Sequence, residues 1–213
     1  MRFFFFSKSF AQETYLGGIA GFLVQNSNAK AVNASSDIKE KVKMGVFVSA
    51  PIERKFNEKI TVQAEPGFAL LGAKYEFTDS ETRYLRRLEF ESANLPVLFK
   101  YYVHKNININ AGASFVYIVS ANSKLVDGVD GRTPFGEAAY TFLANETDYN
   151  DYVKRFSINP FVGLEIVSDR GFYFSLRYSL GLSNIAETHP DNELSSLKNS
   201  YLNLGFGYKF KLK

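Results

Sequence analysis

One histidine, His189, lies among residue types that a hydrolytic site uses. Glu187 and Asp191 flank it, and Ser195 and Ser196 follow. A serine nucleophile needs a histidine base that an acid orients, so this segment has the composition of a Ser-His-acid site. Residues of these types in a connecting segment are usually only solvated, and they make a site only when they converge. We therefore expect no catalytic residues here and no enzyme.

A second set of charged residues is spread over segments in which polar and apolar residues alternate, and its members fall on the polar side. The set consists of Glu65, Lys100, Arg155, Glu165, Arg177 and Lys209. Side chains of this kind either line a small polar conduit or pair with one another in a closed interior. Because a buried charge needs a partner, we expect Arg177 and Lys209 to pair with the two glutamates of the set.

The segment from Ala121 to Tyr152 is acidic and contains several aromatic residues. A connection of this length suggests function, and aromatic residues are favoured at protein interfaces. We predict a partner-binding loop whose contacts are Phe135, Tyr140, Phe142, Tyr149 and Tyr152. The alternatives are a cover without function and a Ca²⁺ site at Asp127–Gly131, although that spacing is not an EF-hand loop.

The composition limits the fold and the classes of function. The chain has 213 residues with 21 Phe, 13 Tyr and no Cys, so it suits one strand-rich domain without disulfides or thiolate metal sites. No run of 18 apolar residues exists, which excludes a transmembrane helix. The net charge of +3 and the lack of a basic-aromatic cluster argue against nucleic acid. We expect no cofactor and no metal.

Strands must position these residues, because apolar side chains recur at every second position in eight segments. The segments are residues 14–25, 41–50, 60–75, 86–102, 107–120, 153–167, 172–182 and 201–210. In the fourth, the apolar side changes, and we expect a bulge near Ser92–Asn94 to add the residue needed. Bulges or distortions are also expected at Pro66, Pro96 and Pro160, because proline removes a ladder donor.

The last segment has one wholly apolar side. Its apolar side chains are Leu202, Leu204, Phe206, Tyr208 and Phe210. Alternation alone does not separate a membrane barrel from a soluble barrel with an apolar interior. The apolar sides carry no charge through their centres, as lipid requires, because Lys or Arg at the midplane costs about 2–4 kcal/mol. The connections also alternate between short and long, which is typical of outer-membrane barrels. We therefore predict an all-β, eight-stranded, antiparallel, up-and-down transmembrane β-barrel over residues 12–213.

The first residues, Met1–Ala11, have the order of a secretory signal. Arg2 precedes four Phe, and Ser9-Phe10-Ala11 fits a small-x-small cleavage site. Four residues are fewer than the roughly 7–15 of an apolar signal region. Either the printed start lies downstream of the true start or the segment is no signal; we expect an incomplete signal peptide that ends at Ala11.

Several runs resemble a known family. They are TVQAEPGFALLGAKYEF (61–77), NLPVLFKYY (94–102), AGASFVYIVSANSK (111–124), FVGLEI (161–166) and FSLRYSLGLSNI (174–185). These runs are similar to the PorT-like outer-membrane β-barrel family of Bacteroidetes. The resemblance implies an eight-stranded barrel of the OmpA and OmpX type in the bacterial outer membrane. It also implies that the barrel-assembly machinery recognises the terminal strand.

The function expected from these observations is structural, binding or assembly, through long extracellular loops. The partners expected are outer-membrane lipid, the assembly machinery and a protein at the loops, and the lumen is expected to be closed. Two alternatives stay open, namely a small-solute channel of porin-like type and a component of the gliding-associated type IX secretion apparatus to which the family's founding member belongs.

Overall fold

The computed structural model describes residues 13–32, 37–78, 83–129, 147–189 and 194–212, with the side chains of 83–84 and 125–129 left out. Almost all of this part of the chain is strand, with one short 3₁₀ turn, η1. Within these ranges, no helix is long and apolar enough to cross a membrane. The elements are β1 (Glu13–Ala31), β2 (Asp37–Lys41), β3 (Lys43–Ser49), β4 (Ile52–Lys55), β5 (Ile60–Ala64), β6 (Gly67–Thr78), β7 (Arg83–His104), β8 (Ile107–Val129), β9 (Thr147–Asp148), η1 (Asn150–Tyr152), β10 (Phe156–Val167), β11 (Phe172–Ser179) and β12 (Leu194–Lys211).

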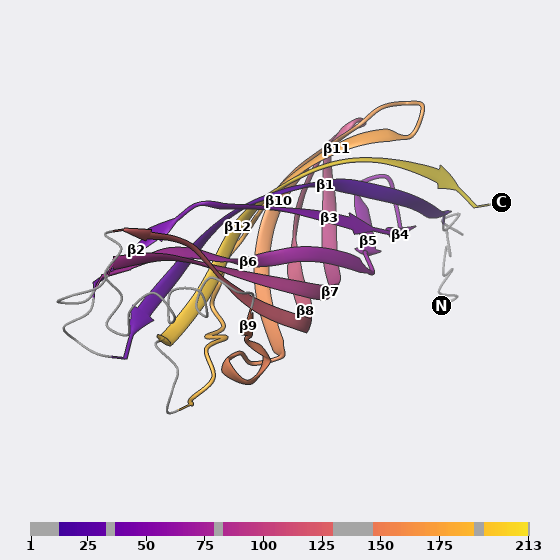
Figure 1. Ribbon diagram of the computed structural model, residues 1–213. Helices are drawn as coiled ribbons and strands as arrows, with labels where there is room; N and C mark the ends of the chain where they lie inside the picture. The colour runs from indigo at the N-terminus through magenta and orange to yellow at the C-terminus, as the bar shows by residue number, and fades with distance from the viewer. Residues whose placement is uncertain (1–12, 33–36, 79–82, 130–146, 190–193, 213) are drawn as a thin grey trace, which may run out of the picture.

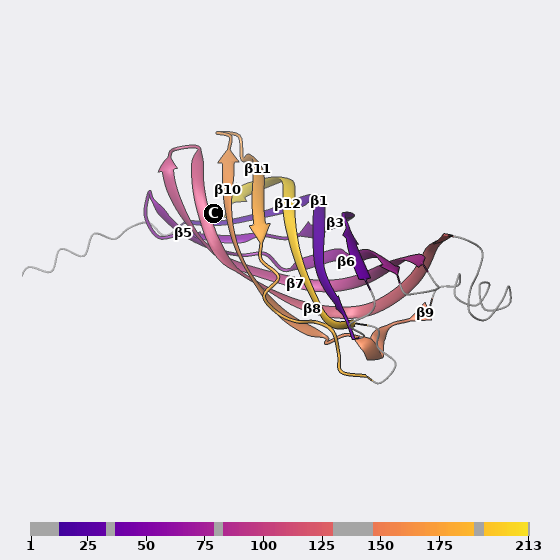
Figure 2. The same cartoon turned by 90° about the vertical axis from the view of Figure 1, so that its left-hand side faces the viewer.

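The strands close into one ring. Successive strands pair antiparallel, and β1 pairs with β12 from Tyr15 opposite Lys211 to Lys30 opposite Ser196, so the sheet has no free edge there. β2, β3 and β4 together make one pass through the ring, and β5 and β6 make the next. The result is an eight-strand, all-β antiparallel barrel, which confirms the predicted architecture (Figures 1 and 2).

The two ends of the barrel differ in their connections. At one end, here the turn end, residues 56–59, 105–106 and 168–171 join neighbouring strands. The opposite end, here the loop end, carries the longer connections and the tips of β2 and β9 (Figure 1). Several strands reach further toward the loop end than the sequence indicated, since residues 26–31, 121–129 and 194–200 are strand rather than loop. Backbone pairing with the neighbouring strands continues through these residues, although their sequence shows no regular apolar alternation.

Side chains alternate between the interior and the outer surface. On β12, Phe206, Tyr208 and Phe210 are exposed and Leu202 and Leu204 are half-buried, all on the outer side. The same outward exposure holds for Phe68 and Phe99, at 66% and 65%. Exposed large hydrophobic side chains occur on most strands of the ring, and we call them the outer belt. So many exposed apolar side chains mark a surface that meets lipid or a partner.

The change of apolar side in β7 has a different cause from the expected bulge. Leu88, Phe90, Ser92, Leu98 and Lys100 all point inward, so β7 keeps one alternation throughout. The extra residue lies in the neighbouring strand β8, where the ladder steps from Ser120 opposite Glu91 to Ile118 opposite Ser92 and leaves out Val119. The predicted bulge therefore exists beside Ser92, but its extra residue belongs to β8, and in β7 the polarity of the two faces changes without a change in the direction of the side chains.

The three strand prolines also behave differently from one another. Pro66 separates β5 from β6, as a missing ladder donor predicts. Pro96 and Pro160 lie inside the continuous strands β7 and β10, and the register does not shift at either position. The distortion expected at these two prolines is therefore absent, and their carbonyl groups still accept hydrogen bonds from Glu65 and Leu180.

Candidate functional site

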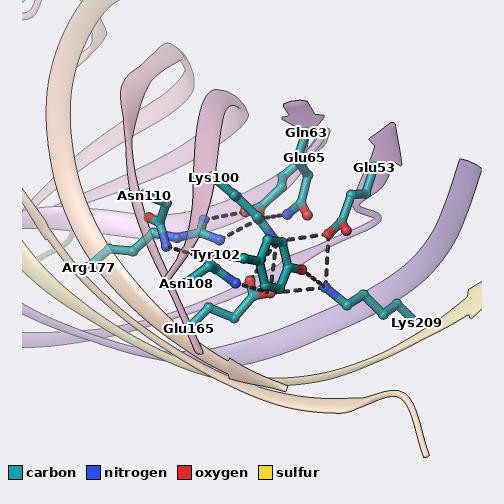
Figure 3. Close-up of polar contacts among 10 residues, drawn as sticks. All are labelled: Glu53, Gln63, Glu65, Lys100, Tyr102, Asn108, Asn110, Glu165, Arg177 and Lys209. Carbon is teal, nitrogen blue, oxygen red and sulfur yellow. Dashed lines mark hydrogen bonds and ion pairs between the residues drawn. The ribbon is translucent and has the colours of Figure 1, made fainter. Parts of the chain in front are cut away.

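Six charged side chains meet in the interior of the barrel toward its turn end (Figure 3). Three are carboxylates and three are cations, and every one of them is buried. They come from β4, β7, β10, β11 and β12 and from the residue that follows β5. The six are Glu53, Glu65, Lys100, Glu165, Arg177 and Lys209.

Four of the six form a closed ring of alternating charge, here the charge ring. Lys100 Nζ lies 2.7 Å from Glu165 Oε2 and 3.0 Å from Glu53 Oε2. Lys209 Nζ lies 2.9 Å from Glu53 Oε2 and 3.0 Å from Glu165 Oε1. The four residues come from every second pass around the barrel, so their contacts cross the lumen from wall to wall.

The other two charges form a separate pair next to the ring. Arg177 Nη1 and Nη2 donate to the two oxygens of Glu65 at 2.5 and 2.6 Å, which is the bidentate geometry of a strong pair. The Gln63 amide also donates to Glu65. Gly163 leaves the space for the arginine, because a Cβ there would lie 2.6 Å from Arg177 Cγ.

The six charges balance, and amides complete the network. Asn108 Nδ2 donates to Glu165 Oε1 at 3.3 Å, and Tyr102 Oη lies 3.5 Å from Lys209 Nζ. Every carboxylate contacts at least one cation, so no net charge is left to attract an ion. Within the described ranges no group of three or more acidic or histidine side chains is arranged to hold a metal. This arrangement fills the turn-end half of the barrel with charges that satisfy one another.

The charged set in the structure differs from the predicted set at two residues. Arg155 is exposed and lies outside the network, where its Nη1 donates to the Val119 carbonyl at 2.8 Å. Glu53 takes the place of the missing member, although the sequence reading assigned it to a connection. A signal for Glu53 existed, because the alternation that places Lys43 and Ser49 inward continues past Pro51 to position 53.

A second, apolar set of side chains fills the interior toward the loop end, here the apolar layer. Its members come from all around the ring and are almost fully buried. They include Leu23, Leu71, Tyr75, Leu88, Phe90, Ile118, Ala121, Leu194 and Leu197. The lumen is therefore occupied at two levels, by charges near one end and by hydrocarbon near the other.

The candidate loop contacts divide into two groups. Tyr149 is buried in the apolar layer and Tyr152 packs against it, with the two rings stacked at 4.9 Å, so Tyr149 is not the exposed contact that was predicted. Phe135, Tyr140 and Phe142 lie outside the described residues, as do the expected signal Met1–Ala11 and part of the Asp127–Gly131 segment.

His189 and Ser195, two of the residues weighed as a Ser-His-acid site, contact different parts of the chain. The ring of His189 meets the ring of Tyr152 at 4.9 Å, and Ser195 Oγ donates to the carbonyl groups of Lys30 and Ala31 on β1. Asp191 lies outside the described residues. The serine is thus bound to the barrel wall instead of to a base.

At the turn end, two neighbouring turns are joined by an exposed ion pair. Lys105 Nζ lies 2.9 Å from Asp169 Oδ1. The hydrogen bond from Lys105, with a second from Asn106, holds the pKa of the Asp169 carboxyl below its usual range. An exposed pair of this kind contributes little to stability, because water and salt screen it.

Comparison with known proteins assigns the family. Residues 8–187 match the model of the outer membrane protein beta-barrel domain. No curated protein matches the chain. Similar solved structures include the attachment invasion locus protein Ail of Yersinia pestis, with 13% identity, a TM-score of 0.48, and coverage of 93% of this chain and 99% of Ail. Another is the neisserial surface protein A, with 10% identity, a TM-score of 0.48, and coverage of 92% and 97%. Because the family match spans most of the chain, the protein belongs to the outer membrane protein beta-barrel domain family and is a β-barrel protein of the bacterial outer membrane.

Proposed function

We propose that the protein is a closed barrel that acts as a binding or assembly component through its loop-end connections, and that it conducts no solute. The observation that carries this proposal is the filling of the lumen at two levels. The charge ring spans the interior with Lys100 and Lys209 each between two carboxylates. Toward the loop end, the apolar layer fills the interior with buried side chains from around the ring, which supports a closed lumen. Eight strands enclose little space beyond their own side chains, so neither layer has room to step aside.

The partner-binding element we propose is the connection from β8 to β9, with Phe135, Tyr140 and Phe142 as its contacts. The point where this connection returns to the barrel is firmly anchored. β9 pairs with β8, the Tyr149 amide donates to the Ala121 carbonyl at 2.8 Å, and Asn150 Oδ1 accepts from the Ala121 amide at 3.0 Å. An anchored base supports presentation of the segment away from the membrane, as in outer-membrane barrels, whose longer loops are extracellular.

The closed lumen is tested by recordings in planar bilayers. We expect the purified protein to show no stable conductance, with a porin of known conductance as the control for the bilayer. Heat-dependent migration on gels of protein recovered from liposomes shows separately that the barrel has inserted. Steady channels whose conductance changes in Glu165→Ala or Arg177→Ala would replace this proposal by the small-solute channel.

A separate crosslinking experiment tests the proposed interaction role. A photo-crosslinking residue at Tyr140 in intact cells is expected to capture a protein, and the same residue at the outward, lipid-facing position Phe174 serves as the matched control. Replacement of residues 135–142 by a short Gly-Ser linker leaves the anchored Tyr149 in place. If that replacement changes neither the captured protein nor any cell phenotype, the connection is only a cover.

A second candidate function is membership of the gliding-associated protein secretion apparatus. The resemblance of the runs at 94–102 and 174–185 to the PorT-like family supports it; the first run lies in β7, and the second covers the end of β11 and the residues that follow it. Loss of secreted cargo in a strain that lacks the gene, with rescue by the full chain, tests it. We further propose that the assembly machinery recognises β12, whose outward residues end in Tyr208 and Phe210.

A further inference from the structure

The backbone ladder between β3 and β6 is interrupted. These strands pair only from Phe47 opposite Ala69 to Ser49 opposite Gly67, while β2 pairs with β6 up to Lys41 opposite Lys74. Residues 42–46 and 70–73 lie between the two ladders and do not pair with each other, five residues against four. We call this place the β3–β6 gap. By contrast, β6 pairs with β7 without interruption from Gly67 opposite Asn94 to Thr78 opposite Arg83.

Inward side chains form hydrogen bonds with backbone groups of β6 at the gap. Gln25 Nε2 donates to the Leu70 carbonyl at 3.3 Å, and the Gly72 amide donates to Gln25 Oε1 at 2.8 Å. Lys43 Nζ donates to the Leu71 carbonyl at 2.9 Å. Gly72 has a φ of +149°, and a Cβ there would lie 2.9 Å from Lys43 Nζ. The glycine therefore gives the lysine its place in the gap.

Lys43 is a buried lysine that forms no ion pair with the described side chains. Its exposed fraction is 6%, and no carboxylate among the described side chains lies within ion-pair distance. Lys100 and Lys209, which are similarly buried, each contact two carboxylates. Glu89 is engaged on the outer surface by Arg87 at 2.8 Å and Lys124 at 3.4 Å. A buried ammonium group is costly unless a counter-charge reaches it, so the site is suited to an anion from outside the chain.

A pocket of about 490 Å³ opens at this lysine. One part of its lining is hydrocarbon that points outward, from Phe22, Met44, Val46 and Leu70. The other part is polar, from Lys43, Arg87, Glu89, Glu91, Asn122 and Lys124. The pocket therefore has an apolar side along the outer belt and a charged side where the outer surface becomes polar. Its volume is in the range of sites for one small ligand.

We propose that the β3–β6 gap binds a single-chain carboxylate amphiphile of the fatty-acid class. Its carboxylate accepts a hydrogen bond from Lys43 Nζ, and its chain lies over Phe22, Met44 and Leu70 on the outer surface. The other two cations of the lining, Arg87 and Lys124, contact Glu89, so Lys43 offers a single ammonium group, which suits a monoanion. The carboxylates of Glu89 and Glu91 on the rim oppose a larger or more highly charged head group, and the pocket volume suits one chain rather than two.

The absence of Trp from the chain makes a direct test possible. Phe22→Trp places a single fluorophore at the apolar side of the pocket, and Phe174→Trp places the control on the outward face of β11. The full-length protein in a nonionic detergent is titrated with a brominated fatty acid and with the brominated alcohol of the same chain length. We expect the acid to quench Phe22→Trp at about a tenfold lower concentration than the alcohol, since a charge-assisted hydrogen bond is worth at least that factor. At Phe174→Trp the two probes should quench alike.

Lys43→Gln keeps a donor for the Leu71 carbonyl but removes the charge. In the Phe22→Trp protein we expect it to abolish the preference for the acid, and Lys43→Arg should retain it; heat-dependent gel migration verifies folding. If Lys43→Gln does not fold, competition by unbrominated fatty acid, but not by alcohol, in the protein with Lys43 carries the test. Equal quenching by acid and alcohol with Lys43 present overturns the proposal. Competition by a two-chain phospholipid as strong as that by the acid overturns the single-chain class.

Discussion

The two halves of the barrel interior reverse the usual relation between inside and outside. Toward the turn end, β7 places Lys100 inside and Phe99 and Tyr101 outside. Toward the loop end, the same strand places Leu88 inside and Glu89 outside, without any change in the direction of its alternation. One wall therefore encloses a charged interior under an apolar exterior, and then an apolar interior under a charged exterior.

The medium around the barrel explains this difference. Where water surrounds the wall, burial of hydrocarbon inside is favourable, as in a soluble domain. Where lipid surrounds the wall, hydrocarbon gains little by pointing inward, and the outer face must be free of charge. The interior there is filled by polar groups that satisfy one another. The switch near Glu91 therefore marks where the outer surface passes from lipid to water.

The bulge at Val119 in β8 lies at this switch and sets the direction of the side chains beyond it. With Val119 left out of the ladder, Ala121 and Ser123 point inward, and Lys124 points outward to Glu89 at 3.4 Å. Without the extra residue, the alternation would send Lys124 into the apolar layer, because a one-residue step reverses every later side chain. β7 needs no bulge, since its own sequence changes from one pattern to the other.

The largest effect is expected in the charged half. Glu65→Ala removes the carboxylate that holds Arg177 in a bidentate pair and leaves the buried guanidinium without its contacting counter-charge. Breaking a buried pair in this way costs about 3–5 kcal/mol of the free energy of unfolding. Denaturant unfolding in detergent, followed by the change in gel migration, measures the loss. Sequential removal of both partners, as Glu65→Ala with Arg177→Met, should recover most of it.

That double variant also distinguishes pairing from packing. Two apolar residues of suitable volume replace a buried ion pair at little or no cost. A double variant as unstable as Glu65→Ala alone would mean that the charges hold the strands in a way that hydrocarbon does not replace. The charged half would then need its ion pairs to fix the arrangement of its strands, in addition to needing polar groups because lipid surrounds it.

A somewhat smaller loss is expected in the apolar half. Leu88 is fully buried in the apolar layer, and Leu88→Ala leaves a cavity that costs about 2–5 kcal/mol. Val97→Ala, on the same strand but on the lipid side, is the matched control and should lose much less, because lipid chains fill the space. Equal losses at the two positions would show that the apolar layer does not pack as a core. The same unfolding assay compares them.

Most of the fold was open to prediction because alternation is a local property. The eight passes, their antiparallel order and the outward side of β12 follow from residues at every second position, such as Phe206 and Tyr208. The charged set followed from the polar side of the same strands. Five of its six members were identified, since Glu65, Lys100, Glu165, Arg177 and Lys209 lie within strong strand patterns.

The remainder depended on relations between strands that one segment does not reveal. The inward alternation of β3 continues past Pro51 to Glu53, but only the pairing of β4 with β1 and β5 shows that a strand resumes there. The β3–β6 gap arises from a difference of one residue between two ladders. The bulge was sought in β7 because the pattern changes there, but the partner strand supplies the extra residue.

The smallest expected effect concerns Arg155, which was predicted inside the lumen and instead binds the bulge. A bulge leaves a carbonyl group without its ladder donor, and Arg155 Nη1 supplies one to Val119 at 2.8 Å, while the Arg155 carbonyl accepts from the Ile118 amide at 2.7 Å. Arg155→Ala removes only the side-chain bond. Because the site is exposed and water can replace the donor, the loss of unfolding free energy should be about 0.5–1.5 kcal/mol.

The clearer effect of Arg155→Ala is local. Amide hydrogen exchange of β8 around Val119 should become faster, while exchange near Lys100 should not change. Arg155→Lys, with a shorter and single-pointed donor, should restore part of the protection. Unchanged exchange at the bulge in Arg155→Ala would mean that the ladder alone holds Val119 in place, and that the switch between the two halves needs no support from β10.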